Sequence, residues 1–112
     1  MVVEDDVLVR TVIAEALRDA GLRVIEASNA NEALGYLASG EPVDLIFSDI
    51  QLTGSMGGVD LVRIVREKYA HVITVLTSGG GAALAEGHPH FIEKPYELPD
   101  AVARIIGLLG KK

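Results

Sequence analysis

The chain has 112 residues, contains no cysteine and carries a formal charge of −6 at pH 7. This length fits one domain with its own core, and a hydrophobic content of 49% excludes a disordered chain. The absence of cysteine excludes disulfides, thiolate metal sites and thiol nucleophiles. An acidic domain without a basic stripe predicts no direct nucleic-acid contact and suits bound cations or basic partners. We expect a cytoplasmic domain that makes no membrane contact, because no apolar run reaches bilayer length and no signal peptide is visible.

The first forty residues alternate between strand and helix signals. A short apolar run at 2–3 precedes residues 9–20, in which apolar positions recur at helical spacing. Residues 22–27 predict a strand of mixed polarity, which suits the edge of a sheet. Asn29, with a glutamate three residues later, resembles a capping box and opens a helix that stops near Gly40.

The alternation continues through the second half of the chain. Residues 43–49 form an apolar strand signal, 58–69 a helix signal and 71–78 a β-branched strand signal. Residues 90–94 predict a fifth strand, and the apolar stripe over 98–109 predicts a last helix. The glycine-rich connection between the fourth and fifth strands contains few helix formers, so we expect a shortened fourth helix there.

This pattern predicts βαβ units, and therefore a parallel sheet with helices on both faces. Ligands of such sheets bind beyond the carboxyl ends of the strands. The polar residues at those ends are Glu4, Asp5 and Asp6 after the first strand, Asp49 after the third, Thr77 and Ser78 after the fourth, and Lys94 after the fifth. We expect the fold to bring these side chains to one edge of the sheet.

Several carboxylates together with a main-chain carbonyl form a site of hard oxygen ligands, which suits Mg²⁺. A carboxylate between a metal cation and a lysine ammonium suits phosphoryl transfer, where neutralisation of charge supplies most of the catalysis. An acidic turn before a helix is also a common helix cap, so that interpretation stays open for the opening acidic stretch. For Asp6, at the start of the first helix, N-capping is the better interpretation.

Four motifs, "VVEDD", "DLIFSDIQLTGSMGGVDL", "VLTSG" and "FIEKPY", occur in the order and spacing of one family. Over nearly the whole chain the sequence resembles the receiver domain of bacterial two-component response regulators. The resemblance implies one receiver domain over 1–112, with a flavodoxin-like, doubly wound, five-stranded parallel sheet in the order 2-1-3-4-5. The loop "GSMGGVDL" is similar to that of receivers in hybrid histidine kinases, which act in phosphorelays.

The resemblance also implies a function. The domain would be a phosphoacceptor switch that uses Mg²⁺ and is not an enzyme, although it assists its own phosphorylation and dephosphorylation. Its partner would be a histidine kinase or a histidine phosphotransfer protein. The sequence carries no signal for an oligomeric state.

Carried over by position, the resemblance makes Asp49 the phosphoacceptor and a Mg²⁺ ligand. Asp5 corresponds to a direct Mg²⁺ ligand, and Glu4 to an acidic residue that acts through water. The main-chain carbonyl of Gln51 corresponds to a further ligand.

A second group of residues corresponds to the family's switch. Lys94 matches the lysine that pairs with the phosphoryl group, and a cis Lys94-Pro95 peptide is expected. Ser78 matches the switch hydroxyl, in preference to Thr77, because it precedes a small residue. Phe91 stands at the aromatic switch position.

Two alternatives belong to other functional classes. A phosphatase acting through an aspartyl phosphate would need a second acid two residues after Asp49, where Gln51 stands. A flavodoxin-like cofactor-binding module would need a hydroxyl-rich phosphate loop after the first strand. That position holds three acidic residues, which would repel a phosphate.

Overall fold

The sheet is parallel, as the sequence pattern predicted, and its strand order is β2-β1-β3-β4-β5, as the family resemblance implied. The computed structural model describes residues 1–79, 88 and 90–110. The strands are β1 Val2–Val3, β2 Glu26–Ala27, β3 Leu45–Asp49, β4 Ile73–Ser78 and β5 Phe91–Glu93. The helices are α1 Val7–Asp19, α2 Ala30–Ala38, α3 Gly58–Lys68 and α4 Leu98–Leu109. None of these helices is long and apolar enough to cross a membrane.

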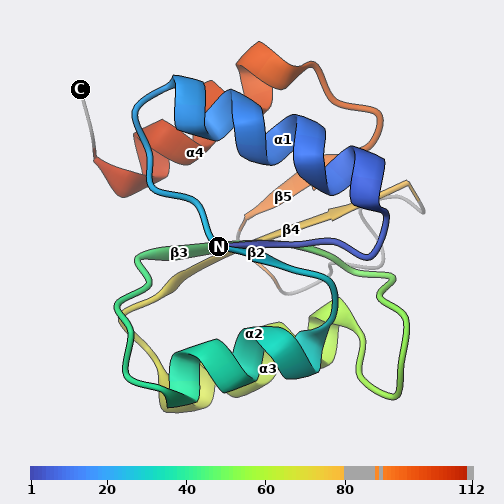
Figure 1. Ribbon diagram of the computed structural model, residues 1–112, viewed down its shortest axis with the longest axis vertical. Helices are drawn as coiled ribbons and strands as arrows, with labels where there is room; N and C mark the ends of the chain where they lie inside the picture. Colours follow the sequence, from blue (N-terminus) through green and yellow to red (C-terminus); the bar gives the residue numbers. More distant parts are fainter. Residues whose placement is uncertain (80–87, 89, 111–112) are drawn as a thin grey trace.

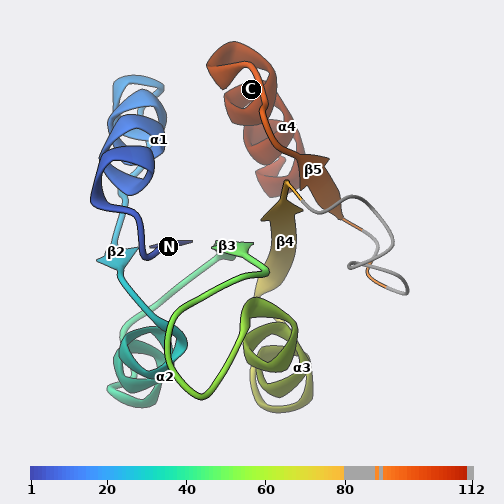
Figure 2. The same cartoon turned by 90° about the vertical axis from the view of Figure 1, so that its right-hand side faces the viewer.

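Helices cover both faces of the sheet. Figure 1 shows α1 and α4 on one face and α2 and α3 on the other, and Figure 2 shows the same three layers along the strands. The β3 side chains alternate between the two layers, with Leu45 and Phe47 in the core under α1 and α4 and Ile46 in the core over α2 and α3. All five β3 residues are buried, as expected for a central strand.

The helix starts confirm two predicted caps. The Asp6 carboxylate accepts hydrogen bonds from the amides of Leu8 (2.9 Å) and Val9 (3.1 Å), so Asp6 is the N-cap of α1. Asn29 caps α2 by accepting from the amide of Glu32 at 2.8 Å. The Glu32 carboxylate returns to the amide of Ser28 instead of that of Asn29, so the capping box closes one residue earlier than predicted.

Some sequence predictions are wrong in detail. The predicted strand at 22–27 is limited to Glu26–Ala27, because its partner β1 offers only two residues for pairing. Val12, which belongs to the predicted apolar stripe of the first helix, is exposed, and Ala14 faces the core in its place. The predicted short fourth helix falls mainly on 80–87 and 89, outside the described residues.

Candidate functional site

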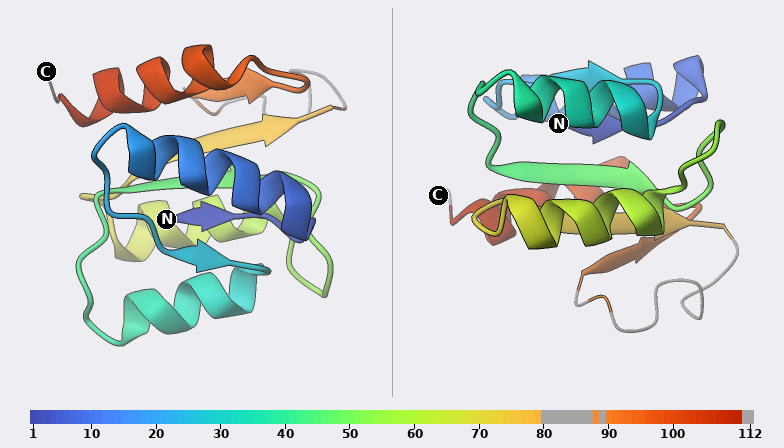
Figure 3. Two further views of the ribbon diagram at one scale, coloured as in Figure 1. Left: turned by 45° about the horizontal axis from the view of Figure 1, so that its top comes forward. Right: turned by 90° about the horizontal axis from the view of Figure 1, so that it is seen from below.

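The carboxyl ends of the strands point to one edge of the sheet, where the polar residues of the sequence motifs collect. Figure 3 shows the strand arrows running in a common direction. Glu4 and Asp5 follow β1, Asp49 is the last residue of β3, and Lys94 follows β5. Residues from positions 4 to 94 of the chain therefore meet in one place.

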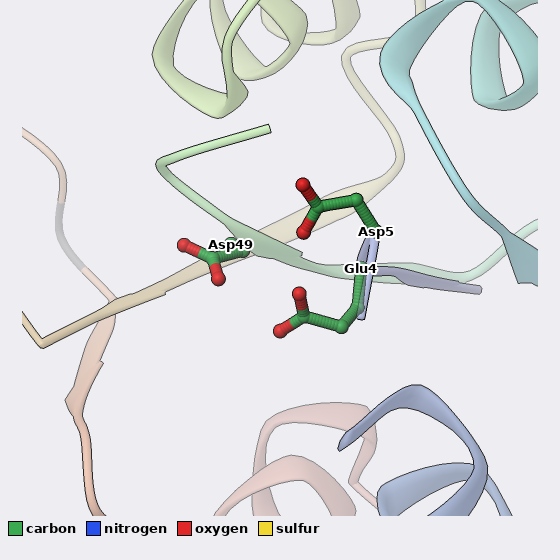
Figure 4. A group of neighbouring side chains, drawn as sticks. All are labelled: Glu4, Asp5 and Asp49. Carbon is green, nitrogen blue, oxygen red and sulfur yellow. The ribbon is translucent and has the colours of Figure 1, made fainter. Parts of the chain in front are cut away.

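Three carboxylates form a compact acidic cluster at this edge. One carboxylate oxygen from each of Glu4, Asp5 and Asp49 lies within 4.8 Å of the others. Figure 4 shows these side chains gathered at the strand ends. Glu4 is 4% exposed and Asp49 is 7% exposed, while Asp5 is half-buried. Such close and poorly hydrated like charges repel one another unless a cation accompanies them.

Lys94 supplies one positive charge to this cluster. Its Nζ donates to Asp49 Oδ2 at 2.7 Å and to Glu4 Oε1 at 2.8 Å. The Lys94-Pro95 peptide is cis, as expected from the family resemblance. Three carboxylates facing one ammonium leave an excess of two negative charges, the charge that a divalent cation neutralises.

Burial and the contact between Glu4 and Lys94 shift the pKa of both groups. Burial raises the pKa of Glu4, and the hydrogen bond from Lys94 only partly offsets that effect. Burial alone would lower the pKa of Lys94, but its hydrogen bonds to Asp49 and Glu4 raise that pKa overall. Lys94 is thus held as a cation between two carboxylates.

Both carboxylate oxygens of Asp49 are fixed in direction. Oδ2 accepts from Lys94, and Oδ1 accepts from the amide of Gln51 at 2.9 Å. The main-chain oxygen of Asp49 accepts from the buried hydroxyl of Ser48 at 3.0 Å. These contacts hold the Asp49 carboxylate in one orientation.

The residues present fit a Mg²⁺ ion. Hard carboxylate oxygens are the ligands that Mg²⁺ prefers, and the Glu4, Asp5 and Asp49 oxygens lie close enough to share one ion. The excess negative charge favours such an ion. The ligand role predicted for the Gln51 carbonyl stays a prediction.

The proposed switch residues lie on β4 and β5. Ser78 is fully buried at the end of β4, in register with Glu93. Phe91, at the start of β5, is half-buried against Val62 and Leu76. The switching role of Ser78 and Phe91 stays a prediction.

Two residues of this edge were missed by the sequence reasoning. The Arg10 guanidinium donates to the main-chain oxygen of Glu4 at 2.8 Å, which ties α1 to the acidic loop. Tyr96 packs edge-to-face on Phe47 with ring centroids 5.8 Å apart, and burial raises the pKa of its phenol. Tyr96 could have been identified from the sequence, because it follows Lys94 by two residues. No feature of the sequence pointed to Arg10.

Comparison with known proteins identifies one matching family model and several similar proteins. A family model described as the response regulator receiver domain matches residues 1–106. The chain is 35% identical over 103 residues to the nitrogen assimilation regulatory protein NtrX of Azorhizobium caulinodans, covering 86% of this chain and 22% of that protein. It is 31% identical over 110 residues to the DNA-binding transcriptional regulator NtrC of Salmonella typhimurium, covering 93% of this chain and 23% of that one. The chain therefore spans less than a quarter of these curated relatives.

Solved structures show the same likeness. The receiver domain of NtrX from Brucella abortus superposes with a TM-score of 0.82 at 30% identity, covering 96% of this chain and 94% of that one. A response regulator receiver protein from Sinorhizobium medicae superposes with a TM-score of 0.88 at 26% identity, covering 97% of this chain and 91% of that chain. None of the relatives named here is a hybrid histidine kinase, and that expectation stays a prediction.

Proposed function

This chain belongs to the response regulator receiver domain family, and we propose that Asp49 is the phosphoacceptor of its switch. A receiver domain is a regulatory module of two-component signalling, not a classical enzyme. The observation that carries the proposal is the placement of Asp49 between Lys94 and two further carboxylates. A carboxylate nucleophile held between a lysine and a cation site is suited to phosphoryl transfer.

The transfer step follows from this arrangement. A carboxylate oxygen of Asp49 attacks the phosphorus of a phosphohistidine, the phosphorus–nitrogen bond breaks, and the imidazole nitrogen keeps the bonding electrons. Lys94 already contacts Asp49 Oδ2 and stabilises the charge on the transferred oxygens. Glu4, Asp5 and Asp49 would hold Mg²⁺, with the Gln51 carbonyl as a further ligand and Glu4 acting through water. The ion would supply neutralisation of the phosphoryl charge.

The partner follows from the chemistry of the donor. We propose a histidine kinase or a histidine phosphotransfer protein that acts in the cytoplasm, with 1–112 working as a single receiver domain. Val7 and Leu8, at the start of α1, are 61% and 77% exposed and follow the acidic loop directly. They offer apolar contact area to a protein that brings a phosphohistidine to Asp49.

The two alternatives find no support among these residues. Gln51 lacks the carboxylate that a phosphatase needs as its second acid. The acidic cluster occupies the strand end where a flavin phosphate would bind, so a flavodoxin-like cofactor site would place like charges together.

Phosphorylation of the isolated domain tests the proposal. The wild-type chain, incubated with acetyl phosphate and Mg²⁺, should gain the mass of one phosphoryl group. Asp49→Asn should gain none, because the amide is no nucleophile. Asp60→Asn is the matched control, since Asp60 is an exposed aspartate whose nearest ion-pair partner is Arg63. Equal phosphorylation of the Asp49→Asn variant would refute the assignment.

A further inference from the structure

Ser48 is a hydroxyl residue in an apolar part of the sheet, one position before Asp49. It is fully buried in the central strand β3. Its neighbours in register are Val3 on β1 and Leu76 on β4, and both are buried. Burial of a hydroxyl at such a position costs free energy unless the hydroxyl finds a hydrogen-bond acceptor. The acceptor of Ser48 is the main-chain oxygen of Asp49, at 3.0 Å.

The main-chain oxygen of Asp49 takes a side-chain donor because β1 ends before it can supply a main-chain donor. Alternate residues of β3 bond to β1, as the Phe47 amide does to the Met1 oxygen at 2.9 Å. Asp49 is the next residue in this row, and a longer β1 would offer its oxygen the amide of Asp5. However, β1 ends at Val3, and the chain then turns into the acidic cluster. The hydroxyl one residue before Asp49 takes the place of that amide.

The peptide unit that joins Asp49 to Ile50 is held at both of its polar atoms. Its oxygen accepts from Ser48, and its nitrogen donates to the Thr77 oxygen at 2.9 Å. Because a peptide unit is planar, these two hydrogen bonds fix the direction in which the chain leaves β3. The next amide, that of Gln51, points back to Asp49 Oδ1 and donates to it at 2.9 Å. The placement of the Gln51 main chain therefore depends on the Ser48 hydroxyl.

We propose that Ser48 is a positioning residue of the Mg²⁺ site, because it holds the main chain of Gln51 in place. The inference rests on the proposed function, in which the Gln51 carbonyl is a ligand of the ion. Mg²⁺ tolerates little departure from its preferred coordination geometry, so a ligand carried by the main chain must be held firmly. Ser48 acts on that ligand through the peptide unit between Asp49 and Ile50 and does not touch the ion.

The loss of the Ser48 hydroxyl should affect the metal more than the phosphoacceptor. Lys94 holds Asp49 Oδ2 through a direct side-chain contact at 2.7 Å, which does not pass through the peptide unit that Ser48 fixes. Without the hydroxyl, Asp49 therefore keeps its contact with Lys94, while the Gln51 main chain is less well placed. We expect weaker Mg²⁺ binding, together with a nearly normal phosphorylation rate once Mg²⁺ is saturating.

The test compares Ser48→Ala and Ser48→Cys with the wild type. Cysteine fills the space of serine, but its S–H group is a weak donor. Calorimetric titration should show Mg²⁺ affinity lowered roughly tenfold in both variants, as is usual when a group that orients a metal ligand is removed. With acetyl phosphate and saturating Mg²⁺, both variants should gain phosphoryl mass at a rate close to that of the wild type.

A second measurement needs no metal. Amide hydrogen exchange, followed by NMR in the metal-free domain, should be faster at Gln51 in Ser48→Ala than in the wild type. Thr74→Val is the control for both measurements, because Thr74 is another buried hydroxyl residue of the sheet, near the start of β4 and away from the acidic cluster. That variant should keep the wild-type affinity for Mg²⁺ and the wild-type exchange rate at Gln51.

Three results would overturn the inference alone. They are wild-type Mg²⁺ affinity in folded Ser48→Ala or in Ser48→Cys, an unchanged exchange rate of the Gln51 amide in Ser48→Ala, and slow phosphorylation of either variant at saturating Mg²⁺. The last result would mean that Ser48 acts on the phosphoacceptor and not on the metal ligand. If Ser48→Ala does not fold, the affinity of Ser48→Cys decides. A wild-type chain that binds no Mg²⁺ or takes no phosphoryl group would overturn the proposed function and this inference together.

Discussion

The main-chain oxygen of Asp49 occupies the space that a side chain on Gly58 would need. A Cβ atom at Gly58 would overlap that oxygen and would also lie 2.8 Å from the α-carbon of Ile50. The Gly58 amide donates to the Ile50 carbonyl at 2.8 Å. The first turn of α3 is thus packed directly against the strand end that carries the central carboxylate of the site, and only glycine allows this approach.

Gly58→Ala should therefore destabilise the domain. The obstruction is backbone, which cannot rotate away as a flexible side chain can, so we expect a loss of about 1–3 kcal/mol in the free energy of unfolding. Gly35→Ala is the control, because Gly35 lies in the exposed middle of α2 with nothing within 4 Å of an added Cβ. That change should stabilise the chain by about 0.5–1 kcal/mol. Urea unfolding of both variants measures the difference, and a Gly58→Ala chain as stable as the wild type would contradict the packing described.

Removal of the Asp5 carboxylate and removal of the neighbouring Asp6 carboxylate should change the stability of the metal-free domain in opposite directions. Removal of the Asp5 carboxylate relieves repulsion in the cluster, so Asp5→Ala should stabilise the metal-free domain by about 0.5–1 kcal/mol, the range for a half-exposed charge pair. The same change should weaken Mg²⁺ binding by roughly tenfold or more. Asp6→Ala removes the α1 cap, which costs about 1 kcal/mol, and should leave the affinity for Mg²⁺ unchanged.

Thermal unfolding without metal and calorimetric titration with Mg²⁺ separate the two roles. The assignment of Asp5 is wrong if Asp5→Ala binds Mg²⁺ with wild-type affinity. The assignment of Asp6 is wrong if its removal weakens Mg²⁺ binding as strongly as the removal of Asp5 does.

The alternation of helix and strand signals was sufficient to predict a parallel sheet with helices on both faces, whereas the strand order came from the family resemblance. The convergence of Glu4, Asp49 and Lys94 followed from the parallel arrangement, since each stands just beyond or at the carboxyl end of a strand. Sequence reasoning did not foresee the Arg10 contact, which depends on how α1 lies over the acidic loop. It also could not show that the buried Thr77 hydroxyl has no hydrogen-bond partner among the described residues, because that depends on packing around the strand.

Arg10 should act as a positioning residue for the acidic loop. Its guanidinium donates to the Glu4 main-chain oxygen at 2.8 Å and pairs with Glu26 at 3.3 Å, so it joins α1, β2 and the loop. Arg10→Met should weaken Mg²⁺ binding roughly tenfold, the usual loss when a group that orients metal ligands is removed. Arg18→Met is the control, because Arg18 also pairs with Glu26 but does not contact Glu4 through any hydrogen bond among the described residues. Equal Mg²⁺ affinity of the two variants would show that the loop keeps its place without Arg10.

Lys94 should give the domain a distinctive loss of stability at alkaline pH. Burial lowers the pKa of Lys94, but hydrogen bonds to Asp49 and Glu4 outweigh it, so the pKa in the folded domain lies above the ordinary value of 10.5. As pH rises past that value, the unfolded chain releases the proton first, while the folded domain still holds it. The stabilisation by Lys94 is thus fully present below the ordinary pKa and is lost as pH rises through the folded pKa.

Lys94→Met should remove this part of the alkaline decline in the free energy of unfolding. Lys68→Met removes an exposed lysine of α3 and should leave the decline as in the wild type. Urea unfolding of the three chains across the alkaline range measures the slopes, and identical slopes in the two variants would mean that Lys94 is not held as a cation by the acidic cluster.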